Sequence, residues 1–125
     1  MLKSNILCAL LIFMAGVFVC AAQPPEKPLE VTLFFTASCH KCQLVKETLI
    51  PELEKVHPQE ITVIYRDIAD IENYKLLMAA EKRGGKGREI SVPAIVVGDR
   101  VLIGVEQIQK ELKDAVAAQL KAAPA

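Results

Sequence analysis

The sequence predicts a single α/β domain built on a mixed four-stranded sheet with helices on both faces. Along the chain, segments with strand composition alternate with segments of helical periodicity. Near the C-terminus, two short apolar runs are separated by Gly98-Asp99, which is typical of a β-hairpin. The length of 125 residues suits one domain and is too short for two.

The first half of the domain is predicted to contain a strand, a helix and a second strand. Residues 29–36 (LEVTLFFT) are β-branched and aromatic, as in a buried strand. From Cys39 onward the apolar residues recur at helical spacing. Pro51 is expected to kink this helix or to start its second half, because proline lacks a backbone donor. The helix is expected to end at His57, and residues 61–65 (ITVIY) predict the second strand.

The second half begins with a helix over residues 71–82, for which Asp70 is the predicted cap. A basic, glycine-rich loop (RGGKGR) follows over residues 83–88; we expect it to be solvated, with attraction of an acidic partner as the alternative. The remaining elements are two hairpin strands and a terminal helix, at residues 94–97, 101–103 and 105–120. In this β-α-β-α-β-β-α order, the first crossover should make a parallel pair and the hairpin an antiparallel one.

The N-terminal residues are predicted to be a signal peptide. A short segment with one lysine precedes an uninterrupted apolar run over residues 6–19, and small residues follow. The alternative is a membrane anchor, but this run is shorter than the ~20 residues that a spanning helix needs. We therefore divide the chain into a signal peptide, a Pro-rich linker and a domain, at residues 1–22, 23–28 and 29–121. Such a protein is expected in the periplasm or in another extracytoplasmic compartment.

Cys20 offers a further alternative, because bacterial lipoprotein signals resemble this leader in length and position. Those signals have a small residue directly before the lipidated cysteine, where this chain has Val19. We therefore expect cleavage rather than lipid anchoring at Cys20. Cleavage leaves Cys39 and Cys42 as the cysteines of the mature chain.

Cys39 and Cys42 lie in the segment FFTASCHKC, where a strand pattern gives way to a helix pattern. A disulfide across so short a loop restrains little of the unfolded chain, which argues against a purely structural role. If Cys39 begins the helix, unpaired backbone N–H groups and the positive helix end favour its thiolate. Lys41, and His40 when protonated, would favour the thiolate further, unless both point into solvent. The pattern indicates a redox couple in which Cys39 attacks and the less exposed Cys42 resolves.

These features resemble the thioredoxin superfamily, in particular its small thioredoxin-like and glutaredoxin-like domains. The resemblance rests on a strand running into Cys-x-x-Cys at a helix start, on Ser91-Val92-Pro93 before a hairpin, and on the order of the elements. It covers about residues 29–120. It implies that Pro93 is a cis-proline facing the disulfide, and that Val92 offers its backbone to an extended substrate segment.

The resemblance also implies that Cys39 is the exposed attacking cysteine and Cys42 the buried resolving one. Leu33 stands where thioredoxins have a buried acid that helps to deprotonate the second cysteine. Thr36 and Gly104-Val105 stand where glutaredoxins have parts of their glutathione site. A dedicated glutathione site is therefore not predicted.

The predicted function is that of an exported thiol–disulfide oxidoreductase. This enzyme would act on protein thiols or disulfides without a cofactor and would exchange electrons with a membrane redox partner. One alternative is a carrier that binds Cu or Zn through Cys39, His40 and Cys42. Another is an interaction module of the same fold with an idle disulfide. The balance of 15 basic and 15 acidic residues gives no support for a nucleic-acid partner.

Overall fold

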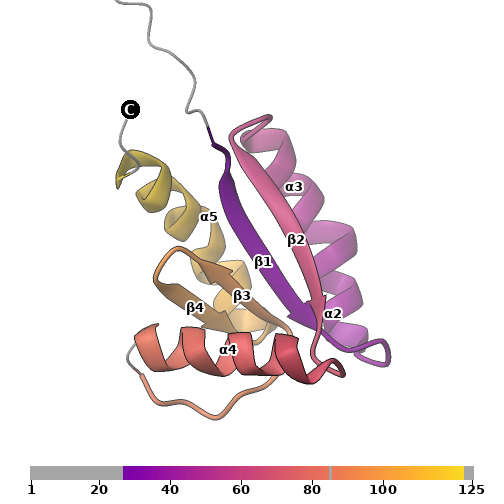
Figure 1. Ribbon diagram of the computed structural model, residues 1–125. Coiled ribbons are helices and arrows are strands. Elements are labelled where there is room, and N and C mark those ends of the chain that lie inside the picture. Colours follow the sequence, from indigo (N-terminus) through magenta and orange to yellow (C-terminus); the bar gives the residue numbers. More distant parts are fainter. Residues whose placement is uncertain (1–26, 85, 123–125) are drawn as a thin grey trace, which may run out of the picture.

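The computed structural model describes residues 27–84 and 86–122, which form a four-stranded mixed sheet with helices packed on it (Figure 1). The strands are β1 (Leu29–Phe35), β2 (Ile61–Asp67), β3 (Ala94–Val97) and β4 (Arg100–Ile103). The helices are α2 (His40–Leu44), the π-helical segment η1 (Val45–Leu49), α3 (Ile50–Val56), α4 (Ile71–Gly84) and α5 (Val105–Ala122). The predicted α/β class with a mixed four-stranded sheet is confirmed. The predicted signal peptide and most of the predicted linker lie outside the described residues.

The sheet has the order β2-β1-β3-β4, so β1 is a central strand. It pairs with β2 in parallel, from Leu29 opposite Ile61 onward. It pairs with β3 in antiparallel fashion, and Ala94 lies opposite Phe34. The end of β1 therefore lies beside the start of β3. The chain that leaves β1 and the chain that enters β3 therefore meet at the same edge of the sheet, by which we mean the edge where the C-terminal end of β1 and the N-terminal end of β3 lie.

The alternation of side chains along β1 divides the core between the two faces of the sheet. Val31 and Leu33 belong to the larger cluster, which α3 and α5 complete, with Ile50, Leu53, Ile108, Leu112, Ala115 and Val116 among its members. Phe34 points to the opposite face, where it packs against Leu77 and Ala80 of α4. Complete burial of a side chain such as Leu33 stabilises the fold by roughly 1.5–3 kcal/mol. The sheet is thus covered on both faces, with α4 alone on one of them among the described helices (Figure 1).

Pro51 lies in the first turn of α3, directly after η1. A proline has no N–H to donate inside a helix, and the first turn is where that loss costs least. The wider π turn before it ends in a bond from the N–H of Ile50 to the carbonyl of Val45. The expectation that Pro51 starts the second half of this helix is confirmed. The next helix, α4, runs two residues beyond its predicted end and reaches Gly84.

Among residues 27–84 and 86–122, no helix combines the length and the apolar character that crossing a membrane requires.

Candidate functional site

The candidate site is a disulfide between Cys39 and Cys42 at the start of α2. Cys39 is the N-cap residue of α2 and has an extended backbone, with φ −85° and ψ 106°. Its carbonyl accepts from the N–H of Gln43 at 3.2 Å, which begins the helical ladder. Its Sγ accepts from the backbone N–H of Cys42 at 3.1 Å. Cys39 therefore takes the place of the oxygen-bearing residues that usually cap helices.

The two sulfur-bearing residues differ in exposure. Cys42 is 1% exposed and lies in the protein interior, whereas Cys39 is only partly buried. His40 and Lys41, which separate them, are both exposed. An incoming thiol or disulfide can therefore reach the sulfur of Cys39 more readily than that of Cys42. Because His40 and Lys41 are solvated, water screens their effect on the sulfur of Cys39.

Val92 and Pro93 precede β3 at the same edge of the sheet where β1 ends. The Val92–Pro93 peptide bond is cis, as the resemblance implies. Pro93 is buried, Val92 is partly buried, and the carbonyl of Pro93 accepts from the N–H of Gly104 at 2.9 Å. Since Ala94 lies opposite Phe34, Pro93 reaches the sheet next to the residue from which the Cys39 segment departs. The register thus brings the two predicted parts of the site to one edge of the sheet.

A contact between a lysine and two aromatic rings was not anticipated from the sequence. The Nζ atom of Lys46, in η1, lies 3.3 Å from the centre of the Phe35 ring and 5.3 Å from the centre of the Tyr65 ring. A cation over an aromatic face is attracted by the charge distribution of the ring. Partial burial, followed by the negative charge of Glu54, raises the pKa of Tyr65 above its ordinary value of 10.0.

Leu33, which stands where thioredoxins have a buried acid, is completely buried in the apolar core.

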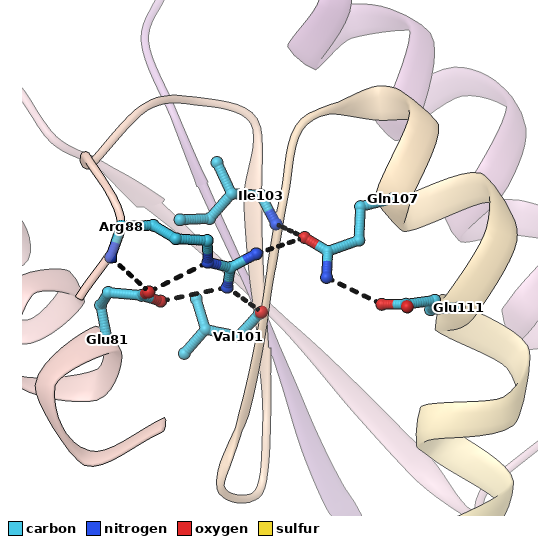
Figure 2. Close-up of polar contacts among 6 residues, drawn as sticks. All are labelled: Glu81, Arg88, Val101, Ile103, Gln107 and Glu111. Atoms are coloured by element: carbon cyan, nitrogen blue, oxygen red, sulfur yellow. Dashed lines mark hydrogen bonds and ion pairs between the residues drawn. The ribbon is translucent and has the colours of Figure 1, made fainter. Parts of the chain in front are cut away.

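The expectation of a solvated basic loop is wrong for Arg88. Its side chain turns inward and bonds to Glu81 of α4, to the carbonyl of Val101 and to Gln107 of α5 (Figure 2). Glu81 is 3% exposed, and among the residues that the structure describes it is the one charged residue that is buried. A buried carboxylate needs a partner, and Arg88 supplies it.

The metal-carrier alternative requires a set of ligands. Within residues 27–84 and 86–122, no group of three or more His, Cys, Asp or Glu side chains is arranged to hold a metal ion. In the disulfide, moreover, the two sulfurs are bonded to each other and are not thiolate ligands.

No model of a known protein family matches the chain, and no curated protein matches its sequence. What supports a function is therefore the cysteine pair and the sheet that carries it. A Cys39–Cys42 disulfide at a helix start, in a small α/β domain, fits a redox role.

Proposed function

We propose that this protein is an exported thiol–disulfide oxidoreductase with a thioredoxin-like fold, and that Cys39 and Cys42 are its redox couple. The observation that carries the proposal is the pairing of a reachable Cys39 at a helix N-cap with a buried Cys42 one turn later. The Cys42 N–H that faces Cys39 Sγ belongs to the first turn of α2, so we expect it to keep this position when the disulfide is reduced. It can then stabilise a thiolate.

The reaction proceeds by two exchanges of disulfide bonds. In the reduced protein, the Cys39 thiolate attacks one sulfur of a substrate disulfide; a Cys39–substrate bond forms and the second substrate sulfur leaves as a thiolate. Cys42 then loses its proton and attacks the sulfur of Cys39. The Cys39–Cys42 disulfide forms and the substrate is released as a dithiol, so two electrons have passed to the substrate. The same steps in reverse oxidise a substrate dithiol.

The substrates are protein thiols or disulfides, presented on an extended segment beside Val92 and Pro93. This part of the proposal is supported by the position of both residues at the edge of the sheet where β1 ends. A dithiol or disulfide of a membrane redox partner restores the resting state of the pair. The apolar run over residues 6–19 supports export, and cleavage of residues 1–22 would release the domain.

The fully buried Leu33 favours a second candidate function, an interaction module with an idle disulfide. A carboxylate near the resolving cysteine would accept its proton, and leucine cannot. Cys42 must then lose its proton without that help, which slows the second exchange. The two candidates differ in whether the pair turns over.

Reduction of insulin by the wild type with excess dithiothreitol separates them, because an idle disulfide would not accelerate it. A trapping experiment then tests the roles of the two cysteines. The mature chain with Cys42→Ser is incubated in reduced form with insulin, whose disulfides are accessible, and the products are separated without reductant. We expect a mixed disulfide through Cys39 to accumulate, because the resolving thiol is missing. Cys39→Ser is the matched control and should give no adduct. If Cys42→Ser turns insulin over like the wild type, or if no variant forms an adduct, the oxidoreductase proposal is wrong.

A further inference from the structure

We propose that Arg88 is a positioning residue for disulfide exchange with protein substrates: anchored on Glu81, it fixes the segment that carries Val92 and Pro93 beside the redox pair. The inference rests on the proposed function and names a residue that this function had not included. Arg88 does not act on the sulfurs. It acts through the path of the chain between α4 and β3.

Arg88 binds Glu81 through three hydrogen bonds. Its Nε donates to Glu81 Oε1 at 3.0 Å, its Nη2 donates to Oε2 at 3.2 Å, and its backbone N–H donates to Oε1 at 3.2 Å. The side chain of Glu81 is 4% exposed, and that of Arg88 is 30% exposed. A two-pronged guanidinium–carboxylate pair restricts direction as well as distance. The backbone of Arg88 is therefore held against α4, not only its side chain.

The other edge of the guanidinium bonds to the hairpin and to α5, so Arg88 is also held by these two elements (Figure 2). Nη2 also donates to the carbonyl of Val101 at 2.7 Å, and Nη1 donates to Gln107 Oε1 at 2.6 Å. Gln107 is itself fixed, since its Oε1 accepts from the N–H of Ile103 at 2.9 Å and its Nε2 donates to Glu111 at 2.8 Å. Arg88 thus joins three elements that pack around the start of β3.

The chain between Arg88 and β3 has few other restraints. Of residues 86–92, Arg88 contributes the one backbone N–H that bonds to another described residue. Ile90 and Val92 add apolar contacts with the smaller core cluster. At the far end, the carbonyl of Pro93 is held by Gly104. The hydrogen bonds that fix this segment thus lie at its two ends, at Arg88 and at Pro93. Loss of the Arg88 bonds leaves Ile90 and Val92 with their apolar contacts and the Pro93 end alone.

This arrangement predicts that loss of Arg88 lowers the rate of exchange with protein substrates and leaves the rate with small disulfides unchanged. A protein substrate needs an ordered Val92 backbone along which its own chain can lie. A small neutral disulfide needs only the sulfur of Cys39, which Arg88 does not contact in the structure. A loss of overall stability, in contrast, would not change one rate and spare the other while the protein remains folded.

The experiment uses the mature chain with Arg88→Met, Arg88→Lys or Glu81→Gln. Second-order rate constants are measured for reduced protein with insulin and with bis(2-hydroxyethyl) disulfide, a neutral small molecule. Arg88→Met should lower the insulin rate by at least about tenfold and leave the small-disulfide rate within about twofold. The reason is that a misplaced Val92 segment slows only the reaction whose substrate binds along it. Arg88→Lys should behave similarly, because lysine keeps the charge but not the planar fork. Arg83→Met, which removes an exposed positive charge near the same loop, is the matched control and should change neither rate.

A second readout does not depend on catalysis. The amide order parameters of Ile90 and Val92, measured by NMR, should be near ~0.85 in the wild type and below ~0.6 in Arg88→Lys or Glu81→Gln. If both rates fall together, if neither falls, or if the order parameters do not change, the positioning role is wrong. If the wild type exchanges with neither disulfide while the order parameters fall as expected, the proposed function fails and Arg88 still orders the segment. If Arg88→Met does not fold, the other two variants decide.

Discussion

The backbone N–H of Cys42 donates to the sulfur of Cys39, with 3.1 Å between N and Sγ. The two residues are linked twice, by this hydrogen bond and by the disulfide. When the disulfide is reduced, the N–H faces a sulfur that can ionise. A hydrogen bond to the charged form of a group favours that form, and bonds to an ionised acceptor are the stronger ones.

The first prediction concerns the acidity of Cys39. The pKa of the reduced Cys39 thiol should lie below the ~8.5 of a free cysteine. The check is the rate of alkylation of Cys42→Ser with iodoacetamide as a function of pH, because this variant keeps only the attacking thiol in the mature chain. A midpoint at or above that of a free cysteine would mean that the helix start does not activate Cys39.

The second prediction concerns His40 and Lys41. Lys41→Ala should make the Cys39–Cys42 pair slightly less oxidising, because a cation near the thiolate stabilises the reduced form. His40→Ala should do the same at a pH at which His40 is protonated. Both residues are exposed, so each shift should stay below about 20 mV, which corresponds to the ~1 kcal/mol ceiling of solvated charge pairs. Lys110→Ala, which removes an exposed charge from α5, is the control. Larger shifts, or equal shifts in the control, would contradict this placement of the charges.

The third prediction concerns the pH dependence of stability. The side-chain hydrogen bonds from Arg88 hold the pKa of Glu81 below its ordinary value of 4.5, although burial opposes this shift. A carboxyl group with a lowered folded-state pKa stabilises the fold above the unfolded-state pKa, and this contribution is lost as the pH falls through the folded-state value. Glu81→Gln should therefore cost about 1–3 kcal/mol at neutral pH.

Urea unfolding of the wild type and of Glu81→Gln across the acid range tests this third prediction. The difference in the free energy of unfolding should begin to shrink below pH 4.5, where the unfolded chain binds a proton at Glu81, and should be lost as the pH falls through the lower folded-state pKa. Asp114→Asn, at an exposed position on α5, is the matched control and should show little difference at any pH. A Glu81→Gln difference that is the same at all pH values would show that the charge of Glu81 is not what stabilises the fold.

The fourth prediction concerns Lys46 and Phe35. The ammonium group lies 3.3 Å from the ring centre, so the pair should show a coupling energy of about 0.5–1 kcal/mol in a double-mutant cycle with Lys46→Met and Phe35→Leu. The measured quantity is the free energy of unfolding in urea. Additive losses in the double variant would mean that the lysine gains nothing from the ring.

Most of the fold follows from local pattern. Residues 29–35 have strand composition, and the helical spacing begins directly after Cys39, so the position of the disulfide at a helix start could be predicted. Gly98-Asp99 predicted the hairpin, where Gly98 has φ +58°, a conformation that favours glycine. Pro51 marked the second half of the long helix, because its missing N–H limits where it can stand.

The inward-facing contacts of Arg88 depend on the tertiary structure and could not be predicted in the same way. In the sequence it belongs to a basic, glycine-rich stretch that looks solvated, and its partner lies seven residues earlier on another element. One local signal existed. Glu81 follows Leu77 by one helical turn and therefore shares the buried stripe of α4, where a charge requires a partner. The contact of Lys46 with Phe35 has no comparable signal, since it depends on how η1 lies over the sheet.

The central claim is that Cys39 and Cys42 form a reversible redox couple. The most direct test is the reduction potential of the pair in the mature chain, measured by equilibration against glutathione buffers. We expect a reversible two-electron transition between about −270 mV, the value of thioredoxin, and about −120 mV, that of a strong oxidant. A potential below about −300 mV, which is typical of structural disulfides, or a disulfide that does not equilibrate with the buffer, would contradict the claim.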